Sequence, residues 1–208
     1  MISSGNNDLD KVIGGYGKEL TIIYGPGASG KTTLSLVAAI GQLDKNKKVV
    51  FIDTENGFSV DRFMQICESN YLNYLDKLLL LKVYSFEDQC KRVDQLINYV
   101  NIDLVIIDSL GKHYRKEIRD NPVETNKKMD RQLRILTELT RRGISVLVTN
   151  QVSTNLETGE IKIVGGDMVK KWGRKLIELK KEPRKISLKK PEEKEGLFEI
   201  IDRGIKVL

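Results

Sequence analysis

Short apolar runs alternate with longer amphipathic segments up to about residue 151. The runs have the length of strands, and the longer segments carry apolar residues at helical spacing. Strands are predicted at residues 20–24, 49–52, 78–83, 104–107 and 144–149. Helices are predicted at residues 32–43, 59–67, 86–100 and 123–142, with Gly143 ending the last one. This alternation predicts a parallel sheet with helices on both faces.

The pattern changes after Gln151. Residues 152–167 are polar and contain glycines, and from Arg174 short apolar runs alternate with charged turns that include Pro183 and Pro191. Further strands are predicted at residues 176–179, 185–188 and 197–201. The expected fold class is therefore α/β, a mostly parallel sheet flanked by helices with a C-terminal antiparallel β-meander. A chain of 208 residues suits one domain, so residues 1–208 are expected to form a single core domain.

Composition is that of a globular protein, with 40% hydrophobic residues. The apolar runs are far shorter than the ~20 residues of a membrane helix, and the first residues lack the basic start and apolar core of an export signal. We expect a cytoplasmic protein with no membrane partner. Cys67 and Cys90 are too few and too far apart for a metal cluster, and we expect them to be reduced and buried.

Positive charge is concentrated in one part of the chain. Residues 111–190 hold 21 Lys and Arg against 10 Asp and Glu, a local charge of +11, whereas the rest of the chain carries −5. Such asymmetry favours a basic face that binds a polyanion such as DNA. An ordinary solvated surface is the alternative that charge alone leaves open.

A glycine-rich loop joins the first predicted strand to the first predicted helix and matches the pattern G-x-x-x-x-G-K-[ST]. The backbone N–H groups of such a loop and the helix N-terminus bind phosphate oxygens. Lys31 is expected to reach the β- and γ-phosphates of ATP, and the Thr32 hydroxyl to bind Mg²⁺. The alternative is a glycine-rich turn that matches this pattern by accident. The predicted strand before the loop and the predicted helix after it make an accidental match rarer. The expected nucleotide contacts are Gly25, Pro26, Gly27, Ala28, Ser29, Gly30, Lys31, Thr32 and Thr33.

Three polar residues stand at the ends of other predicted strands, where open α/β sheets bind ligands. Asp108 ends the run 104–107 and is predicted to hold Mg²⁺ with Thr32, although Asp in this place is also a common helix cap. Glu55 is the candidate catalytic base, with ordinary turn chemistry as its alternative. Gln151 ends another core strand, where it can sense a γ-phosphate.

These motifs together resemble the core of RecA-type recombinases. Residues 2–15, the phosphate loop and the segments 52–55, 104–109, 148–151 and 165–168 occur in the family's order, over essentially the whole chain. The resemblance implies that Glu55 is the catalytic glutamate and that Gln151 is the γ-phosphate sensor at the start of a DNA-binding loop. It also implies that Arg62 stacks on adenine, where the alternative is a solvated helix charge.

Two disordered DNA-contacting loops are characteristic of the family, and the matching segments lie in the basic region. The first is expected at residues 111–125, where cations with one aromatic suit phosphate contact and an occasional stacked base. The second, at 152–164, has one cation and a basic cluster close behind it. His113 is expected on the surface or in a loop, and Trp172 in the core or an interface. The expected DNA contacts are Lys112, Tyr114, Arg115, Lys116, Arg119, Lys162, Lys170, Lys171, Arg174 and Lys175.

The chain also departs from full recombinases. Only 19 residues precede the first predicted strand, so no N-terminal helical DNA-binding domain is expected, and no aromatic-x-x-Ala hook stands upstream. With the ending at 201–205, this looks most like a shorter archaeal paralogue in the family. We expect an ATP- and DNA-binding monomer or small homo-oligomer with weak ATPase activity, which assists a filament-forming recombinase in homologous recombination and DNA repair. The alternatives are a full strand-exchange recombinase and, less favoured, a signalling or clock-type ATPase without a DNA role.

Overall fold

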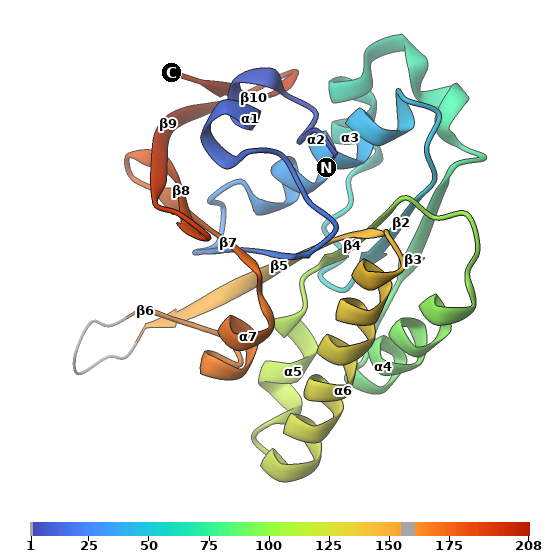
Figure 1. The fold of residues 1–208 in the computed structure, drawn as a ribbon, viewed down its shortest axis with the longest axis vertical. Helices are drawn as coiled ribbons and strands as arrows, with labels where there is room; N and C mark the ends of the chain where they lie inside the picture. Colours follow the sequence, from blue (N-terminus) through green and yellow to red (C-terminus); the bar gives the residue numbers. More distant parts are fainter. Residues whose placement is uncertain (1, 155–160) are drawn as a thin grey trace.

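The computed structural model describes residues 2–154 and 161–208, and within them one mixed sheet runs through the molecule (Figure 1). The strand order is β10-β9-β8-β7-β1-β5-β4-β2-β3, and β6 pairs with β5 outside this path. The described strands are β1 Leu20–Gly25, β2 Val49–Asp53, β3 Leu78–Lys82, β4 Leu104–Asp108, β5 Ser145–Thr154, β6 Ile161–Ile163, β7 Lys175–Lys181, β8 Arg184–Lys190, β9 Lys194–Ile201 and β10 Gly204–Val207.

The sheet has a parallel half and an antiparallel half. Strands β3, β2, β4, β5, β1 and β7 run parallel to their neighbours, whereas β7 to β10 form an antiparallel series. Side chains alternate between the faces, so that on β4 Leu104 and Ile106 enter one buried cluster while Val105 and Ile107 enter the other. The predicted α/β fold, a mostly parallel sheet with a C-terminal antiparallel series, is confirmed.

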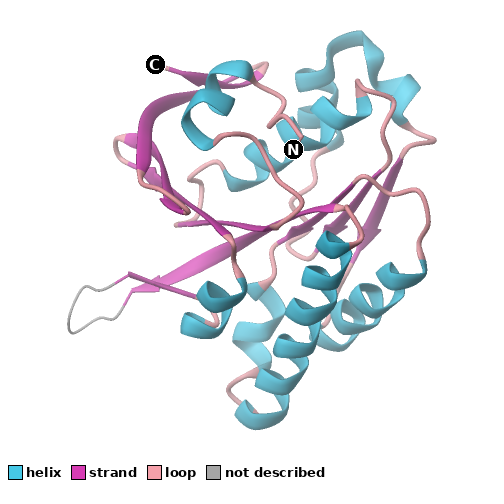
Figure 2. Cartoon of the chain, viewed as in Figure 1, coloured by secondary structure: helices cyan, strands magenta, loops and turns pink. Residues whose placement is uncertain are grey.

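Helices cover both faces of the parallel half (Figure 2). α2 and α3 pack into one buried cluster and α4, α5 and α6 into the other. Capping residues set several helix starts, for example Ser59 before α3 and Ser85 before α4, whose hydroxyls accept backbone N–H groups. The described helices are α1 Asn7–Ile13, α2 Lys31–Leu43, α3 Val60–Cys67, α4 Phe86–Gln95, α5 Gly111–Glu117, α6 Pro122–Arg141 and α7 Gly166–Trp172, with 3₁₀ segments η1 Glu68–Tyr74 and η2 Leu96–Asn98.

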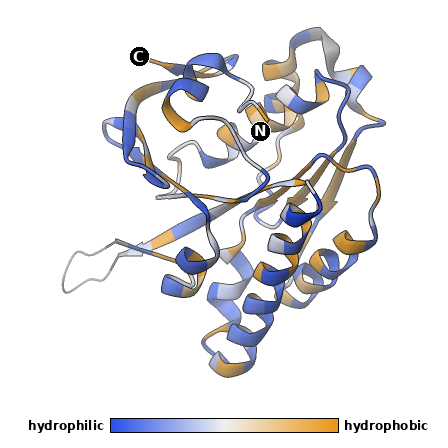
Figure 3. Ribbon diagram, viewed as in Figure 1, coloured by the Kyte–Doolittle hydropathy of each residue, from blue (hydrophilic) through white to orange (hydrophobic). Residues whose placement is uncertain are grey.

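Hydropathy follows this layering. Figure 3 shows hydrophobic colour along the central strands, whereas helices such as α6 carry both hydrophilic and hydrophobic colour. On α6 the buried side includes Met129, Leu133, Leu136 and Leu139, as their spacing predicts. Among the described residues, no helix combines the length and apolar character needed to cross a bilayer.

Several elements differ from the sequence prediction. The prediction of one helix over residues 86–100 is wrong at its end, because α4 stops at Gln95, a 3₁₀ turn follows, and Val100 is 78% exposed. The prediction of an irregular loop at residues 111–125 is also wrong, since α5 and the start of α6 occupy it. Pattern reading missed α1, α7, β6 and β10, all of which are short.

The strand register brings the chemically interesting residues to one edge of the sheet. Asp53 pairs with Asp108 across β2 and β4, and Gly25 pairs with Gln151 across β1 and β5. All four strands run parallel, so their carboxyl ends share this edge. The fold therefore gathers residues from distant parts of the sequence around the start of α2.

Candidate functional site

The glycine-rich loop lies between β1 and α2, and its backbone requires glycine at two places. Gly30 has φ +104°, a left-handed conformation that glycine adopts freely. A Cβ on Gly25 would lie 2.3 Å from the Leu179 carbonyl oxygen of β7, so only glycine fits there. Because the loop leads directly into the N-terminus of α2, unpaired helix N–H groups and the positive end of the helix dipole face the loop.

The Lys31 side chain folds back across this loop. Its Nζ donates to the carbonyl oxygens of Gly25 at 3.0 Å and Pro26 at 2.7 Å. Burial lowers the pKa of Lys31, while the nearby carboxylates of Glu55 and Asp108 act in the opposite direction. Ser29 Oγ is buried without a hydrogen-bond partner in the described structure. A buried cation beside an unpaired hydroxyl and free N–H groups fits an anionic ligand.

Asp108 links three elements at the edge of the sheet. Thr32 Oγ1 of α2 donates to Asp108 Oδ2 at 2.6 Å, and Thr149 Oγ1 of β5 donates to Asp108 Oδ1. Burial raises the pKa of Asp108; the two hydroxyl bonds oppose this rise, and the charges of Glu55 and Asp53 add to it. A carboxylate whose charged form is costly to bury suits a cation partner.

The donor set fits a hard divalent cation that is shared with a phosphate ligand. Thr32 and Asp108 offer oxygen atoms, which Mg²⁺ prefers, and Mg²⁺ usually takes one or two protein ligands beside phosphates and waters. Among the described residues, no group of three or more His, Cys, Asp or Glu side chains is placed to hold a metal. A cation here would therefore complete its coordination with phosphate oxygens and water.

Glu55 and Gln151 lie together, as their positions at strand ends predict. Gln151 Nε2 donates to Glu55 Oε1 at 2.7 Å, and Ser109 Oγ donates to the same oxygen. The backbone around Glu55 is fixed by Asp53, whose carboxylate accepts from Glu55 N at 3.2 Å and from Gly57 N at 3.0 Å. The structure thus places a half-buried carboxylate beside the phosphate loop.

Arg62 lies on α3 and contacts the turn between β9 and β10. Its guanidinium donates to the carbonyl oxygens of Ile201 at 2.7 Å and Asp202 at 3.0 Å. Edge-on bonds of this kind leave the planar faces of a guanidinium open for stacking. Its role as an adenine contact stays a prediction.

Sequence reasoning missed several residues that shape this site. Arg184 of β8 donates from Nη1 to Ala28 O of the phosphate loop at 3.1 Å, and no local pattern around it indicates this contact. Thr149 is the last residue of the predicted strand 144–149 and Ser109 follows Asp108, so the signal that found Asp108 and Gln151 was also present for them. Asp53 and Thr54 directly precede Glu55. Asp53 accepts a hydrogen bond from Glu55 N, and the Thr54 hydroxyl donates to Ser109 O.

The two segments expected to contact DNA meet in one groove. α5 and the β5–β6 hairpin lie on the side of the molecule where α7 also packs (Figure 1). A groove of about 550 Å³ between them has a cationic rim and an apolar floor. Arg115 spans the two segments by donating to Val152 O at 3.0 Å. The rim includes Arg115, Arg119 and Lys162, and the floor includes Ile118, Ile163 and Val164.

Two expected DNA contacts are buried, although Tyr114 lines the groove. Tyr114 is 7% exposed, packs against Phe86 and donates its hydroxyl to Asn126 at 2.7 Å, so its ring is not free to stack on a base. Lys175 is 4% exposed, and its Nζ donates to Gly15 O at 2.7 Å. Both expectations are corrected by burial. Part of the second expected loop, residues 155–160, lies outside the described residues.

The remaining expected cations are exposed or half-exposed. Lys112, Lys116 and Arg119 face solvent on or just after α5, Lys162 is exposed on β6, and Lys170, Lys171 and Arg174 are exposed on or just after α7. Trp172 is half-buried, and its Nε1 donates to Asp130 at 2.9 Å, which docks α7 on α6. This contact agrees with the expectation of a core or interface role.

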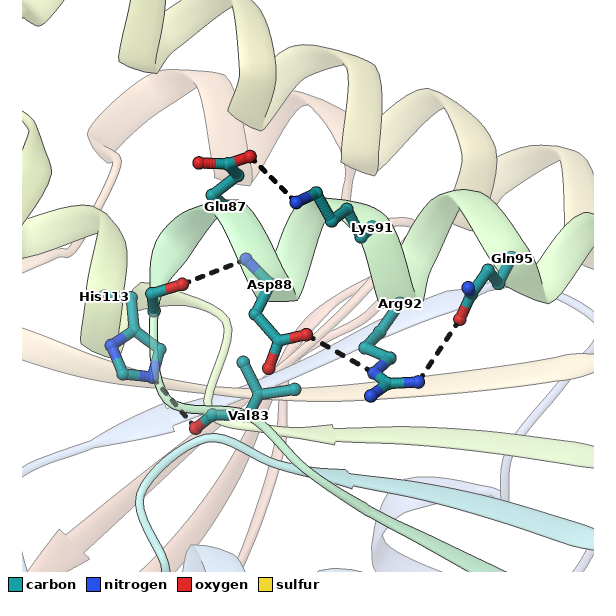
Figure 4. Close-up of polar contacts among 8 residues, drawn as sticks. Val83, Glu87, Asp88, Lys91, Arg92, Gln95 and His113 are labelled. Atoms are coloured by element: carbon teal, nitrogen blue, oxygen red, sulfur yellow. Dashed lines mark hydrogen bonds and ion pairs between the residues drawn. The ribbon is translucent and has the colours of Figure 1, made fainter.

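α4 borders α5, but its cations are paired (Figure 4). Lys91 pairs with Glu87 at 2.9 Å and Arg92 with Asp88 at 3.4 Å. His113 of α5 is half-buried, with Nε2 3.2 Å from Val83 O at the start of the β3–α4 connection. The two cations of α4 that Figure 4 draws are each paired with a carboxylate. We therefore place the basic surface over α5, β6 and α7.

Comparison with known proteins gives one consistent answer. The family model described as Rad51 matches residues 1–206. A protein called "DNA repair and recombination protein RadB" from Methanococcus maripaludis (strain C5 / ATCC BAA-1333) is 31% identical over 201 residues, covering 92% of each chain. The protein of the same name from Thermococcus sibiricus (strain DSM 12597 / MM 739) is 32% identical over 221 residues, covering 99% of this chain and 95% of the relative.

A solved structure shows the same likeness in three dimensions. The structure described as "Crystal structure of the RadB recombinase" superposes with a TM-score of 0.82 and 33% sequence identity, over 100% of both chains. The resemblance to RecA-type recombinases found in the sequence, and within them to the archaeal paralogue RadB, is confirmed. The chain belongs to the Rad51 family of RecA-type recombinases.

Proposed function

We propose that this protein binds Mg²⁺–ATP at the carboxyl edge of the sheet. The observation that carries the proposal is the hydrogen bond from Thr32 to Asp108 beside Lys31, in a glycine loop that opens α2. The loop N–H groups and Lys31 would hold the phosphates, and Thr32 and Asp108 would hold the cation. Bound Mg²⁺ would neutralise charge on the phosphate oxygens. Arg62 would contact the base from α3.

Slow hydrolysis is the expected chemistry. Glu55 is the candidate to take the proton of an attacking water, and Gln151 the candidate to sense the γ-phosphate. Family resemblance implies that a neighbouring subunit completes such a site, so an isolated chain should turn over slowly. The hydrogen bonds that Ser109 and Gln151 donate to Glu55 support the assignment of Glu55 as an oriented base.

DNA is the proposed polyanion partner. Exposed cations on α5, β6 and α7 lie around one groove, and the matched relatives are called DNA repair and recombination proteins. Phosphate contacts by Lys and Arg give affinity with little dependence on base sequence. We propose that the protein assists a filament-forming recombinase in DNA repair.

One experiment tests the proposed DNA binding, its dependence on Mg²⁺–ATP and the size of the assembly. Fluorescent single- and double-stranded DNA would be titrated with the protein, with and without Mg²⁺–ATP, alongside sedimentation of the same mixtures. We expect salt-sensitive DNA binding by a small species. Absence of DNA binding at low salt would instead favour a signalling ATPase, and long assemblies would favour a full recombinase.

A further inference from the structure

Glu55 accepts hydrogen bonds from residues of two other strand segments. Ser109 follows β4 and Gln151 lies on β5, and both donate to the same carboxylate oxygen, Oε1. The hydrogen bonds among the described residues leave Oε2 of Glu55 without a donor. The two oxygens of the carboxylate are therefore not equivalent.

Ser109 itself has little freedom. Its backbone N–H donates to Thr54 Oγ1 at 2.8 Å, and the same Thr54 hydroxyl donates to Ser109 O at 2.6 Å. Thr54 N also donates to Asp108 O at 2.8 Å, so the ends of β2 and β4 are tied together. Ser109 is 0% exposed and Thr54 3% exposed. The backbone that carries the Ser109 hydroxyl is consequently fixed relative to Glu55.

We propose that Ser109 is a positioning residue for Glu55 and that Thr54 fixes Ser109 for this task. The inference rests on the proposed ATP hydrolysis and names how the chain orients its base. Because Oε1 accepts two hydrogen bonds, Oε2 is the atom left to act. Glu55 Oε2 takes a proton from the water whose oxygen bonds to the γ-phosphorus, while the β,γ-bridging oxygen leaves with the electron pair of the broken P–O bond.

The first test uses the full chain without nucleotide, so it does not depend on activity. Side-chain amide signals of Gln151 would be recorded by ¹⁵N–¹H NMR in wild type, Ser109→Ala and Ser145→Ala. Ser145 is a second buried serine, at the opposite end of β5, and serves as the matched control. We expect Ser109→Ala to shift the Gln151 signals and Ser145→Ala to leave them in place. Unchanged signals in Ser109→Ala would overturn the proposal.

Two conservative substitutions at Thr54 test the role of its hydroxyl. Thr54→Ser keeps the hydroxyl and should retain the wild-type Gln151 signals, whereas Thr54→Val removes it at nearly equal volume and should move them. Urea unfolding of each variant shows whether the fold persists. Equal signal shifts in Thr54→Ser and Thr54→Val would contradict the assigned role of the hydroxyl.

The second test separates positioning from binding. In single-turnover hydrolysis, Ser109→Ala should lower the rate about tenfold while the Kd for ATP stays within about twofold, because a hydrogen bond to a charged group is lost away from the phosphates. In a Glu55→Gln background the same change should lower the rate no further. A full additional loss, or an equal loss of affinity, would refute the proposal. If wild type binds no ATP, the proposed function fails, and the Gln151 signals still decide the role of Ser109.

Discussion

Thr32 Oγ1 and Asp108 Oδ2 are 2.6 Å apart, although 76 positions separate the two residues in the sequence. The first turn of α2 and the end of β4 thereby meet at the point where phosphate and cation are expected. The hydrogen bond holds two candidate cation ligands in place before any ligand arrives. Preorganisation of this kind lowers the cost of binding.

Lys31→Ala should abolish measurable ATP binding while the fold persists. The substitution removes the cation that faces the phosphates, and it leaves the carbonyl oxygens of Gly25 and Pro26 without this donor. Fluorescent-nucleotide titration measures the effect, with circular dichroism as the check on folding. Lys45→Ala, an exposed lysine at the other end of α2, is the matched control. ATP affinity unchanged from wild type in Lys31→Ala would contradict the phosphate-loop assignment.

The combined variant Arg115→Ala, Lys116→Ala, Arg119→Ala should weaken DNA binding uniformly across sequences. Each lost phosphate contact should reduce the slope of log K against log salt by about one. Anisotropy titrations at several salt concentrations measure the slope. Alanine at Lys45, Lys47 and Lys48, which are exposed at the amino edge of the sheet, removes equal charge elsewhere. Equal losses of DNA affinity in both triple variants would mean that DNA binding depends only on the net charge of the protein.

Lys175→Ala should destabilise the protein without a specific effect on DNA. Lys175 Nζ contacts Ile13 O, Gly15 O and, at 3.5 Å, the Glu19 carboxylate, all from the segment before β1. Removing this buried donor leaves these acceptors unsatisfied, which costs about 2 to 4 kcal/mol of the free energy of unfolding. Urea unfolding and DNA titration of the same samples measure both effects. A stable variant with weakened DNA binding would restore Lys175 as a DNA contact.

Burial decides which features the sequence could predict. The phosphate loop, Asp108, Glu55 and Gln151 carry local signals, because each adjoins an apolar strand whose end lies at the carboxyl edge of the sheet. Lys175 carries no such signal, since the Gly15 carbonyl that it contacts is 160 positions away. The burial of Tyr114, by contrast, did have a local signal in the sequence. Leu110, Tyr114 and Ile118 recur at helical spacing, which predicts a helix with one face in the core.

Cys90 should react slowly with thiol reagents below about pH 10. Burial raises the pKa of Cys90 to about 11 from an ordinary value near 9. The folded protein thus keeps this proton to higher pH than the unfolded chain, so the contribution to the free energy of unfolding is lost as pH rises from about 9 through about 11. Alkylation rates in a Cys67→Ala background, from pH 7 to 10, measure the effect. Urea-unfolded protein is the control, and equal rates in both states would contradict the prediction.

The segment before β1 bears on how the protein assembles. Residues 2–16 are bound to their own chain: Ile2 pairs with Tyr16, Asn6 Nδ2 donates to Ile205 O at 2.8 Å, and α1 packs on β8, β9 and β10. A segment held in this way is not free to act as a strand-forming hook for a neighbouring subunit.

We therefore expect a monomer or small oligomer with ATP and DNA, and only slight stimulation of hydrolysis by DNA, because the shared ATPase site of a filament would stay incomplete. Electron microscopy with single-stranded DNA and ATP, beside turnover assays, measures both. Asn6→Ala removes the side-chain bond to Ile205 and the cap of α1, and should loosen this segment without creating filaments. Regular helical filaments of wild type, with strong DNA-stimulated turnover, would replace the accessory role with that of a full recombinase.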